Sequence, residues 1–252
     1  MSVVDPTLKH ERALHRGGVR YVIGCDEVGR GAIAGPVAVG LCVVNATVGA
    51  FPQGLRDSKM LSEKRREALA PLSRSWSVLS AVGLASPREV DHLGLSIALG
   101  LAGKRALAAL VAGGIDVAEA VVLLDGSYDY LNPVLATRVR LRTRVRADQE
   151  CASVAAASVI AKVHRDRVMI DADAATPGYG WPENKGYGSS GHLAAIADLG
   201  PTDFHRLTWL RQPPLVETDF MEPECLPAEY PGPEYPGEAG SGREEPVTAK
   251  HS

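Results

Sequence analysis

Apolar residues along this chain gather into short runs of strand length. The runs over 19–26 and 37–44 predict two strands, antiparallel because only a short glycine-rich loop separates them. A looser alternation over 76–84 predicts a third strand. The continuous apolar run 120–124 is typical of a strand that is covered on both faces of its sheet.

Helix-forming segments alternate with these runs and then dominate the second half of the chain. Ser62 and Ser86 stand where N-cap residues stand, and Pro87 follows at a first helical position. The predicted helices cover 8–14, 63–72, 95–112, 151–173 and 192–199. Strands that lead into a helical half predict an α/β domain.

Composition divides the chain into three parts. Residues 1–17 are expected to be a leader of unreadable function, and 18–212 to be the folded domain. Proline, glutamate and glycine dominate 213–252, so this tail cannot bury enough apolar surface to fold. It is expected to be disordered, with a partner-binding segment as the alternative. The 252 residues, 45% of them hydrophobic, suffice for one sizeable core.

Charge is distributed unevenly between these parts. The formal charge of the chain is −3, but 217–252 carry nine acidic and two basic residues. This leaves 21 acidic and 25 basic residues, a charge of +4, for 1–216. A basic folded part is compatible with a polyanionic partner, although many proteins of this charge bind no nucleic acid.

Cysteine spacing and the lengths of the apolar runs exclude several classes of protein. The four cysteines lie far apart without a Cys-x-x-Cys pair, so they indicate neither a disulfide framework nor a zinc site. No apolar segment has the length of a signal peptide, or of the roughly 20 residues that span a bilayer. We therefore expect a protein of the reducing cytoplasm, without a membrane partner.

Arginines occupy every second position over one stretch of the second half. They stand at Arg138, Arg140, Arg142, Arg144 and Arg146. A period of two predicts one strand with an all-arginine face. Two interpretations are open: a phosphate-binding stripe, and an edge strand that its charges protect from aggregation, which we favour.

Two adjacent carboxylates, Asp26 and Glu27, end the first predicted strand. Because like charges in a desolvated place repel each other, the pair predicts a bound cation. The loop that follows contains Gly29, Arg30 and Gly31, whose backbone N–H groups and guanidinium suit close approach to a phosphate or a sugar. Taken alone, a solvated turn is an equally good interpretation.

Two further carboxylates stand at element ends. Asp125 ends the buried strand and is followed by Gly126. A buried carboxylate at Asp125 without a partner would cost several kcal/mol, so a metal ligand is expected there. Asp148 stands at the N-terminal region of the longest predicted helix, near the positive end of its dipole. Four carboxylates without a His or Cys partner are hard oxygen ligands, suited to Mg²⁺ or Mn²⁺.

An ordered series of motifs resembles the ribonuclease HII family. It comprises Asp26-Glu27-Val28-Gly29-Arg30-Gly31, Asp57-Ser58-Lys59, Leu124-Asp125-Gly126, Ala147-Asp148, Ala155 to Val163, and Lys185-Gly186-Tyr187-Gly188. The resemblance spans 21–209. One departure is Gly94, which replaces the asparagine that commonly follows at this distance from Asp91.

The resemblance implies a ribonuclease H-like fold, with a central mixed β-sheet, flanking helices and a helical C-terminal part. It also implies that Asp26, Glu27, Asp125 and Asp148 form one divalent-metal site. The reaction it implies is two-metal hydrolysis of a phosphodiester, which gives 5′-phosphate and 3′-hydroxyl ends.

The resemblance further implies the substrates: RNA/DNA hybrids, and duplex DNA that contains single ribonucleotides. Recognition of the 2′-hydroxyl falls to Gly29, Arg30, Gly31 and Tyr187, whose ring stacks on the deoxyribose after the RNA–DNA junction. The other substrate-binding candidates are Lys59, Ser158, Lys162, Arg165 and Lys185. For the lysines and the arginine, the alternative is an ordinary solvated side chain without a substrate contact. For Ser158, the alternative is a role in helix packing.

Arg30 argues against the sister type HIII, whose loop lacks it. Two other classes stay as alternatives: another ribonuclease H-like nuclease of the resolvase or integrase type, and a nucleic-acid-binding protein without catalysis. A monomer is the expected oligomeric state.

Overall fold

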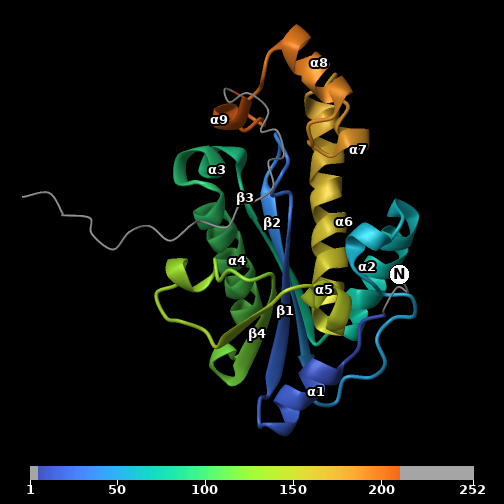
Figure 1. The fold of residues 1–252 in the computed structure, drawn as a ribbon, viewed down its shortest axis with the longest axis vertical. Coiled ribbons are helices and arrows are strands. Elements are labelled where there is room, and N and C mark those ends of the chain that lie inside the picture. Colours follow the sequence, from blue (N-terminus) through green and yellow to red (C-terminus); the bar gives the residue numbers. More distant parts are fainter. Residues whose placement is uncertain (1–4, 211–252) are drawn as a thin grey trace, which may run out of the picture. The chain divides into compact units, whose positions relative to one another are not determined.

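The computed structural model describes residues 5–210, and the structural statements below concern that range. The predicted tail, 213–252, lies outside it. Within it, the predicted α/β class is confirmed: one five-stranded sheet is flanked by helices on both faces (Figure 1).

The sheet has the strand order β3-β2-β1-β4-β5. The strands are β1 (Tyr21–Val28), β2 (Val37–Asn45), β3 (Leu79–Ala85), β4 (Ala120–Asp125) and β5 (Leu141–Arg144). The predicted antiparallel pairing of β1 with β2 is confirmed, and β2 pairs antiparallel with β3. β1 pairs in parallel with β4, and β4 with β5, so the sheet is mixed.

Helices connect the strands and form the C-terminal part. They are α1 (Lys9–Arg16), α2 (Glu63–Trp76), α3 (Pro87–Leu93), α4 (Leu95–Ala112), α5 (Ala147–Glu150), α6 (Ala152–Ala175), α7 (Trp181–Asn184), α8 (Ser190–Leu199) and α9 (Leu207–Leu210). Short 3-10 turns are η1 (Ser58–Met60), η2 (Val117–Glu119) and η3 (Asn132–Val134). Both predicted serine caps are confirmed, since Ser62 Oγ accepts from Arg65 N and Ser86 forms a capping box with Glu89.

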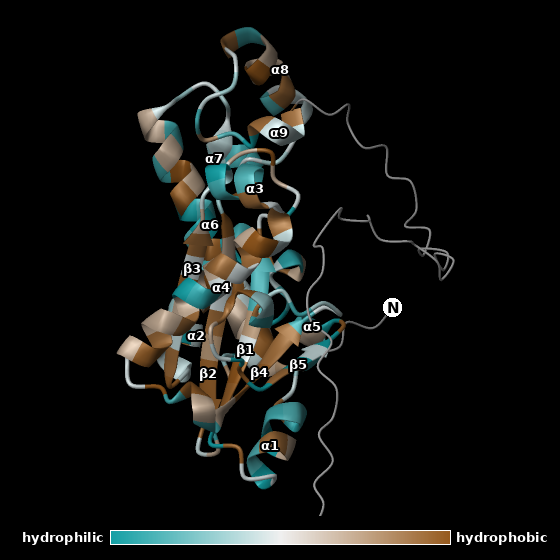
Figure 2. Cartoon of the chain, turned by 90° about the vertical axis from the view of Figure 1, so that its left-hand side faces the viewer, coloured by the Kyte–Doolittle hydropathy of each residue, from teal (hydrophilic) through white to brown (hydrophobic). Residues whose placement is uncertain are grey.

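α4 and α6 cover opposite faces of the sheet (Figure 1). The strands are mostly hydrophobic, as the brown ribbons of Figure 2 show, and several are buried on both sides. α4 is long and apolar enough to cross a membrane by composition alone. Here its buried residues pack on β2 and β3, so the hydrophobic face of α4 belongs to the core.

α6 approaches the sheet closely because glycines face it. A Cβ atom on Gly24 of β1 would lie 2.2 Å from the carbonyl carbon of Ser153, and one on Gly40 of β2 would lie 2.5 Å from the carbonyl oxygen of Ala157. The alanine-rich first half of α6 adds little bulk on its own side. The strand β1, which carries Asp26 and runs two residues beyond it to Val28, is therefore held directly against the backbone of α6.

The N-terminal helix α1 packs into the domain. Its Glu11, only 1% exposed, accepts hydrogen bonds from Ser153 N at 2.9 Å and from Ser153 Oγ at 2.8 Å. Cys151, at the N-cap of α6, makes no side-chain cap. Glu11 thus caps α6 from a distant part of the chain, at the end of α6 that adjoins Asp148.

The arginine-rich strand is shorter than predicted. β5 covers only Leu141–Arg144. The side chain of Arg140, just before it, donates to the carbonyls of Ala118 and Ala120, and Arg146, after it, has a left-handed backbone (φ 60°) that interrupts the extended run. Arg144 pairs with Glu150, so the arginine face is partly neutralised. β5 lies at the edge of the sheet, as the interpretation of a charge-protected edge strand requires.

A buried aromatic cluster joins α7 and α8. His192 Nε2 accepts from Trp181 Nε1 at 3.1 Å and lies 3.2 Å from His205 Nε2, while His192 Nδ1 lies 2.8 Å from the carbonyl oxygen of Tyr187. Burial, with the neighbouring His192 adding to it, lowers the pKa of His205 to about 4. Neutral imidazoles therefore hold the loop that carries Tyr187.

We expect Gly24→Ala to lower the free energy of unfolding by about 3 kcal/mol, because the added methyl group would overlap the α6 backbone. Urea denaturation measures this. Gly49→Ala, where a Cβ atom would meet nothing within 4 Å, is the matched control. Equal urea midpoints for the two variants would contradict this account of the packing.

We expect acidification to destabilise the C-terminal cluster. The folded-state pKa of His205, about 4, lies below its unfolded value of 6.5, so the unfolded chain binds more protons and stability is lost as the pH falls. The loss assigned to His205 between about pH 7.5 and about pH 5.5 is roughly 1 kcal/mol. His205→Asn keeps an acceptor for Thr202 N, and its urea midpoint should fall less over this range than that of the wild type.

Candidate active site

Four carboxylates meet at one edge of the sheet. Parallel pairing sets Cys25 of β1 beside Leu124 of β4, so the residues that follow, Asp26 and Asp125, lie next to each other at the same end of the sheet, each still paired with its other neighbouring strand. Asp148 on α5 joins them because Ala147 N, immediately before it, donates to Asp125 Oδ1 at 2.7 Å. The predicted gathering of distant carboxylates is thus present in the structure.

The electrostatics of this cluster are unfavourable without a cation. Asp26 is 4% exposed, and burial, followed by the charges of Glu27, Asp125 and Asp148, raises its pKa well above the ordinary value. Burial and Asp125 raise the pKa of Asp148 to about 7. Cations at its border are Arg30, whose Nη1 lies 2.9 Å from Glu27 Oε1, and Lys59, whose Nζ lies 3.8 Å from Asp148 Oδ2.

The donor set fits a hard divalent ion. All four side chains offer carboxylate oxygens, and their charges repel one another at partly or fully buried positions. Among residues 5–210, no three His, Cys, Asp or Glu side chains are already close enough to hold a metal by themselves. Mg²⁺ usually takes one or two carboxylates and completes its shell with water and substrate phosphate, which agrees with this looser arrangement.

Glu27 is held by two neighbours. Arg30 Nη1 donates to Glu27 Oε1 at 2.9 Å, and Tyr130 Oη donates to Glu27 Oε2 at 3.2 Å. Burial raises the pKa of Tyr130 well above its usual range, so the hydroxyl stays a donor. No motif in the sequence marks Tyr130, because its contact with Glu27 joins residues that are 103 positions apart.

Ser158 supports a carboxylate from within the protein. It is 3% exposed and donates to Ser58 Oγ at 2.9 Å, and its polar hydroxyl near Asp26 lowers the pKa of that carboxyl. Substrate binding by Ser158 stays a prediction, although its hydroxyl is buried and already bonded. The alternative of a supporting role is the one that the structure favours.

Two buried arginines hold the glycine loop. Arg165, fully buried, donates to the carbonyls of Pro36, Ala34 and Lys185. Arg206 donates to the carbonyls of Gly29 and Arg30. The guanidinium of Arg165 is thus bonded to backbone oxygens that shape the loop, and its predicted phosphate contact stays a prediction.

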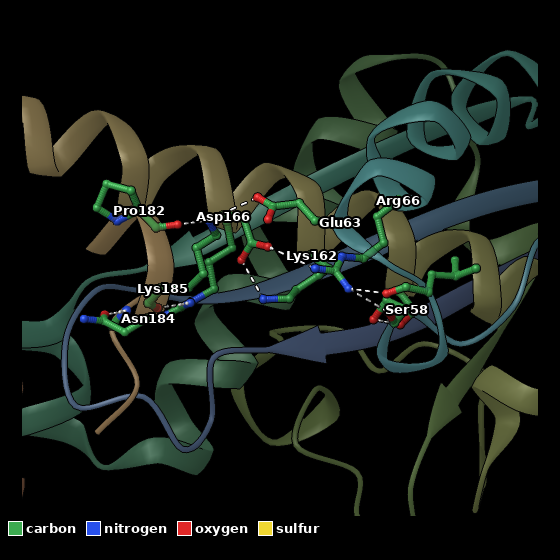
Figure 3. Close-up of polar contacts among 12 residues, drawn as sticks. Ser58, Glu63, Arg66, Lys162, Asp166, Pro182, Asn184 and Lys185 are labelled. Atoms are coloured by element: carbon green, nitrogen blue, oxygen red, sulfur yellow. Dashed lines mark hydrogen bonds and ion pairs between the residues drawn. The ribbon is translucent and has the colours of Figure 1, made fainter. Parts of the chain in front are cut away.

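The predicted phosphate-binding lysines differ in their availability. Lys162 Nζ lies 2.6 Å from Asp166 Oδ1, and Lys185 Nζ lies 3.1 Å from Glu63 Oε1 (Figure 3). Phosphate contacts by these two remain predictions that require the pairs to open. Lys59 is different, because its side chain is 76% exposed at the border of the carboxylate cluster.

Tyr187 stands on the glycine-loop side of the cluster. Its ring is 37% exposed and lies 5.8 Å from Lys162 Nζ and 5.5 Å from the guanidinium carbon of Arg165. The carbonyl of the preceding Gly186 accepts from the N–H groups of Ile33 and Ala34. The structure therefore joins the predicted tyrosine to the predicted glycine loop.

Known proteins similar to this chain share one family description. The family model described as Ribonuclease HII matches residues 23–212. Ribonuclease HII of Streptomyces griseus subsp. griseus is 43% identical over 244 residues, which cover 95% of this chain and 99% of that protein. Ribonuclease HII of Paracoccus denitrificans is 43% identical over 206 residues, which cover 80% and 90%.

A solved structure supports the same assignment. The ribonuclease H2 of Pyrococcus horikoshii OT3 superposes with a TM-score of 0.59 at 26% identity, covering 75% of this chain and 93% of that one. The predicted ribonuclease H-like fold is thereby confirmed.

We expect Tyr130→Phe to weaken Mn²⁺ binding roughly tenfold while leaving the fold intact, because only the hydroxyl that orients Glu27 is removed. Isothermal titration calorimetry with Mn²⁺ measures this. Tyr179→Phe is the control, since that hydroxyl donates to the Gly200 carbonyl instead. Unchanged Mn²⁺ affinity in Tyr130→Phe would show that the contact does not orient the ligand.

Proposed function

The chain belongs to the ribonuclease HII family of ribonuclease H endonucleases, and we propose that it incises duplex DNA 5′ to embedded ribonucleotides as well as cutting RNA in RNA/DNA hybrids. One observation carries the proposal: four carboxylates share an edge of the sheet with a braced glycine loop and a partly exposed tyrosine. A non-catalytic binding protein would not need such a costly concentration of charge.

Mn²⁺ or Mg²⁺ is the proposed cofactor. Asp26, Glu27, Asp125 and Asp148 are the residues that would hold it, as their hard oxygen atoms and mutual repulsion support. When bound, a pair of such ions supplies Lewis-acid chemistry for phosphodiester hydrolysis, activating water and stabilising the leaving oxygen. Tyr130 and Arg30 keep Glu27 in place, and Ser158 orients Asp26.

Ribose recognition is assigned to the glycine loop. Gly29 and Gly31 leave the loop backbone uncovered by side chains. Arg206 donates to the carbonyls of Gly29 and Arg30, which orients the N–H groups of the loop before a substrate binds. The 2′-hydroxyl is the group that distinguishes a ribonucleotide from its neighbours in DNA. Tyr187 is proposed to pack on the deoxyribose that follows, where a second 2′-hydroxyl is absent.

The proposed products carry 5′-phosphate and 3′-hydroxyl ends. A cytoplasmic monomer is the proposed form of the enzyme. The cysteines of the described region, Cys25, Cys42 and Cys151, are all free and buried, which suits a reducing compartment.

We expect Asp125→Asn to reduce incision of a duplex containing one ribonucleotide by at least about a hundredfold, because loss of a ligand should cost more than loss of a supporting partner. A labelled strand resolved by electrophoresis measures the rate, with EDTA as a parallel arm. Asp116→Asn is the matched control, since Asp116 only caps η2.

The position of the cut and an all-DNA duplex complete this experiment. Incision 5′ to the ribose, with no cutting of the all-DNA duplex, is the expected result. Cutting of all-DNA substrate would favour a nuclease of the resolvase type, and binding without cutting would favour a non-catalytic protein.

A further inference from the structure

A cavity of about 520 Å³ adjoins the carboxylate cluster on one side. Glu27, Arg30 and Asp125 form its polar end, and Leu95 and Leu99 contribute apolar wall. Tyr128 lies at its exposed border, with 62% of the residue accessible to solvent. We call this cavity the Tyr128 pocket. Its volume lies within the range of small-ligand sites, roughly 300–1,000 Å³.

The loop that carries Tyr128 is anchored on both sides. Before it, Gly126 N donates to the Arg144 carbonyl at 3.0 Å. After it, Asp129 Oδ1 accepts from the N–H groups of Leu131 and Asn132. This loop, yellow-green between β4 and β5 in Figure 1, also packs on α4 through η3. The backbone that carries the exposed ring is therefore fixed on both sides of Tyr128.

The Tyr128 pocket and Tyr187 adjoin different parts of the glycine loop. Arg30 of the loop lines the pocket together with Glu27 and Asp125, and Tyr187 does not. Farther along the loop, the N–H groups of Ile33 and Ala34 donate to the carbonyl of Gly186, next to Tyr187. A substrate strand whose ribonucleotide lies on the loop therefore has Tyr128 beside the carboxylate end and Tyr187 beside the other end.

The chemistry of the pocket selects which part of a nucleotide enters it. The Arg30 guanidinium is paired with Glu27, so its charge is offset and the pocket's carboxylates repel a phosphate that lacks a cation, whereas Leu95, Leu99 and the ring of Tyr128 suit the apolar face of a sugar. Ser96 and Ser127 add hydroxyls at its border. Gly94, where the family commonly has asparagine, adds no side chain, and a Cβ atom there would meet nothing within 4 Å.

We propose that the Tyr128 pocket binds the deoxynucleotide on the 5′ side of the cut, with the ring of Tyr128 packed against its deoxyribose. This inference rests on the proposed function, because it takes the scissile phosphate to lie at the carboxylates and the ribonucleotide at the glycine loop. Tyr128 is then a substrate-binding residue that sets the register of the strand at the Arg30 end of the glycine loop, whereas Tyr187 lies next to the Ile33 end.

The test couples a variant to a change in the substrate. Tyr128→Ala should raise KM for a DNA duplex with one ribonucleotide roughly tenfold with little change in kcat, by analogy with the loss of other aromatic stacking contacts. Tyr128→Phe keeps the ring and should recover most of that loss. Val111→Ala, which removes an exposed apolar side chain at the far end of α4, is the control.

The substrate change replaces the nucleotide 5′ to the ribonucleotide by a propanediol spacer, which keeps the phosphates and removes the sugar and base. With this spacer, wild type and Tyr128→Ala should have the same KM, because the contact is already absent. With the spacer placed instead at the nucleotide 3′ to the ribonucleotide, the roughly tenfold difference should persist.

Two results would overturn the pocket assignment while leaving the proposed function intact: a wild-type KM for Tyr128→Ala, or an undiminished difference with the 5′ spacer. Failure of the wild-type enzyme to cut the ribonucleotide duplex would instead overturn the proposed function, and the assignment with it.

Discussion

Mutual repulsion among four carboxylates is the constraint on which the rest of this structure depends. Asp26 and Asp148 are buried, and their raised pKa values measure how strongly the cluster resists ionisation without a cation. Backbone packing holds these charges together: the glycine faces of β1 and β2 seat α6 directly on the sheet. Glu11 fixes the start of α6 from α1, so even the N-terminal helix contributes to the placement of Asp148.

Basic residues near the site fall into groups with different tasks. Arg165 and Arg206 are buried and hold the glycine loop by its carbonyls, which fixes backbone where a substrate would approach. Lys162 pairs with Asp166 on α6, and Lys185 of the Tyr187 loop pairs with Glu63 of α2. Burial marks Arg165 and Arg206 as supports of the backbone, whereas exposure leaves Lys59 and Arg30 accessible beside the cluster.

Much of the secondary structure was readable from the sequence, because local physics decides it. The predicted helix 95–112 matches α4 in extent, and the serine caps stand where they were expected. The arginine-rich segment was less readable. The segment does alternate, but the strand covers only Leu141–Arg144, and Arg146 has a left-handed backbone, which a period of two along the sequence does not predict.

The sequence by itself determined the four carboxylates, the glycine loop and the α/β class, because each follows from residue type at the end of a hydrophobic run or from an ordered motif. Only the tertiary structure decided which groups surround them. Tyr130 reaches Glu27 across 103 residues, and Arg165 turns inward to three carbonyls. Such roles depend on burial and on partners distant in the chain, which a local pattern of residues does not encode.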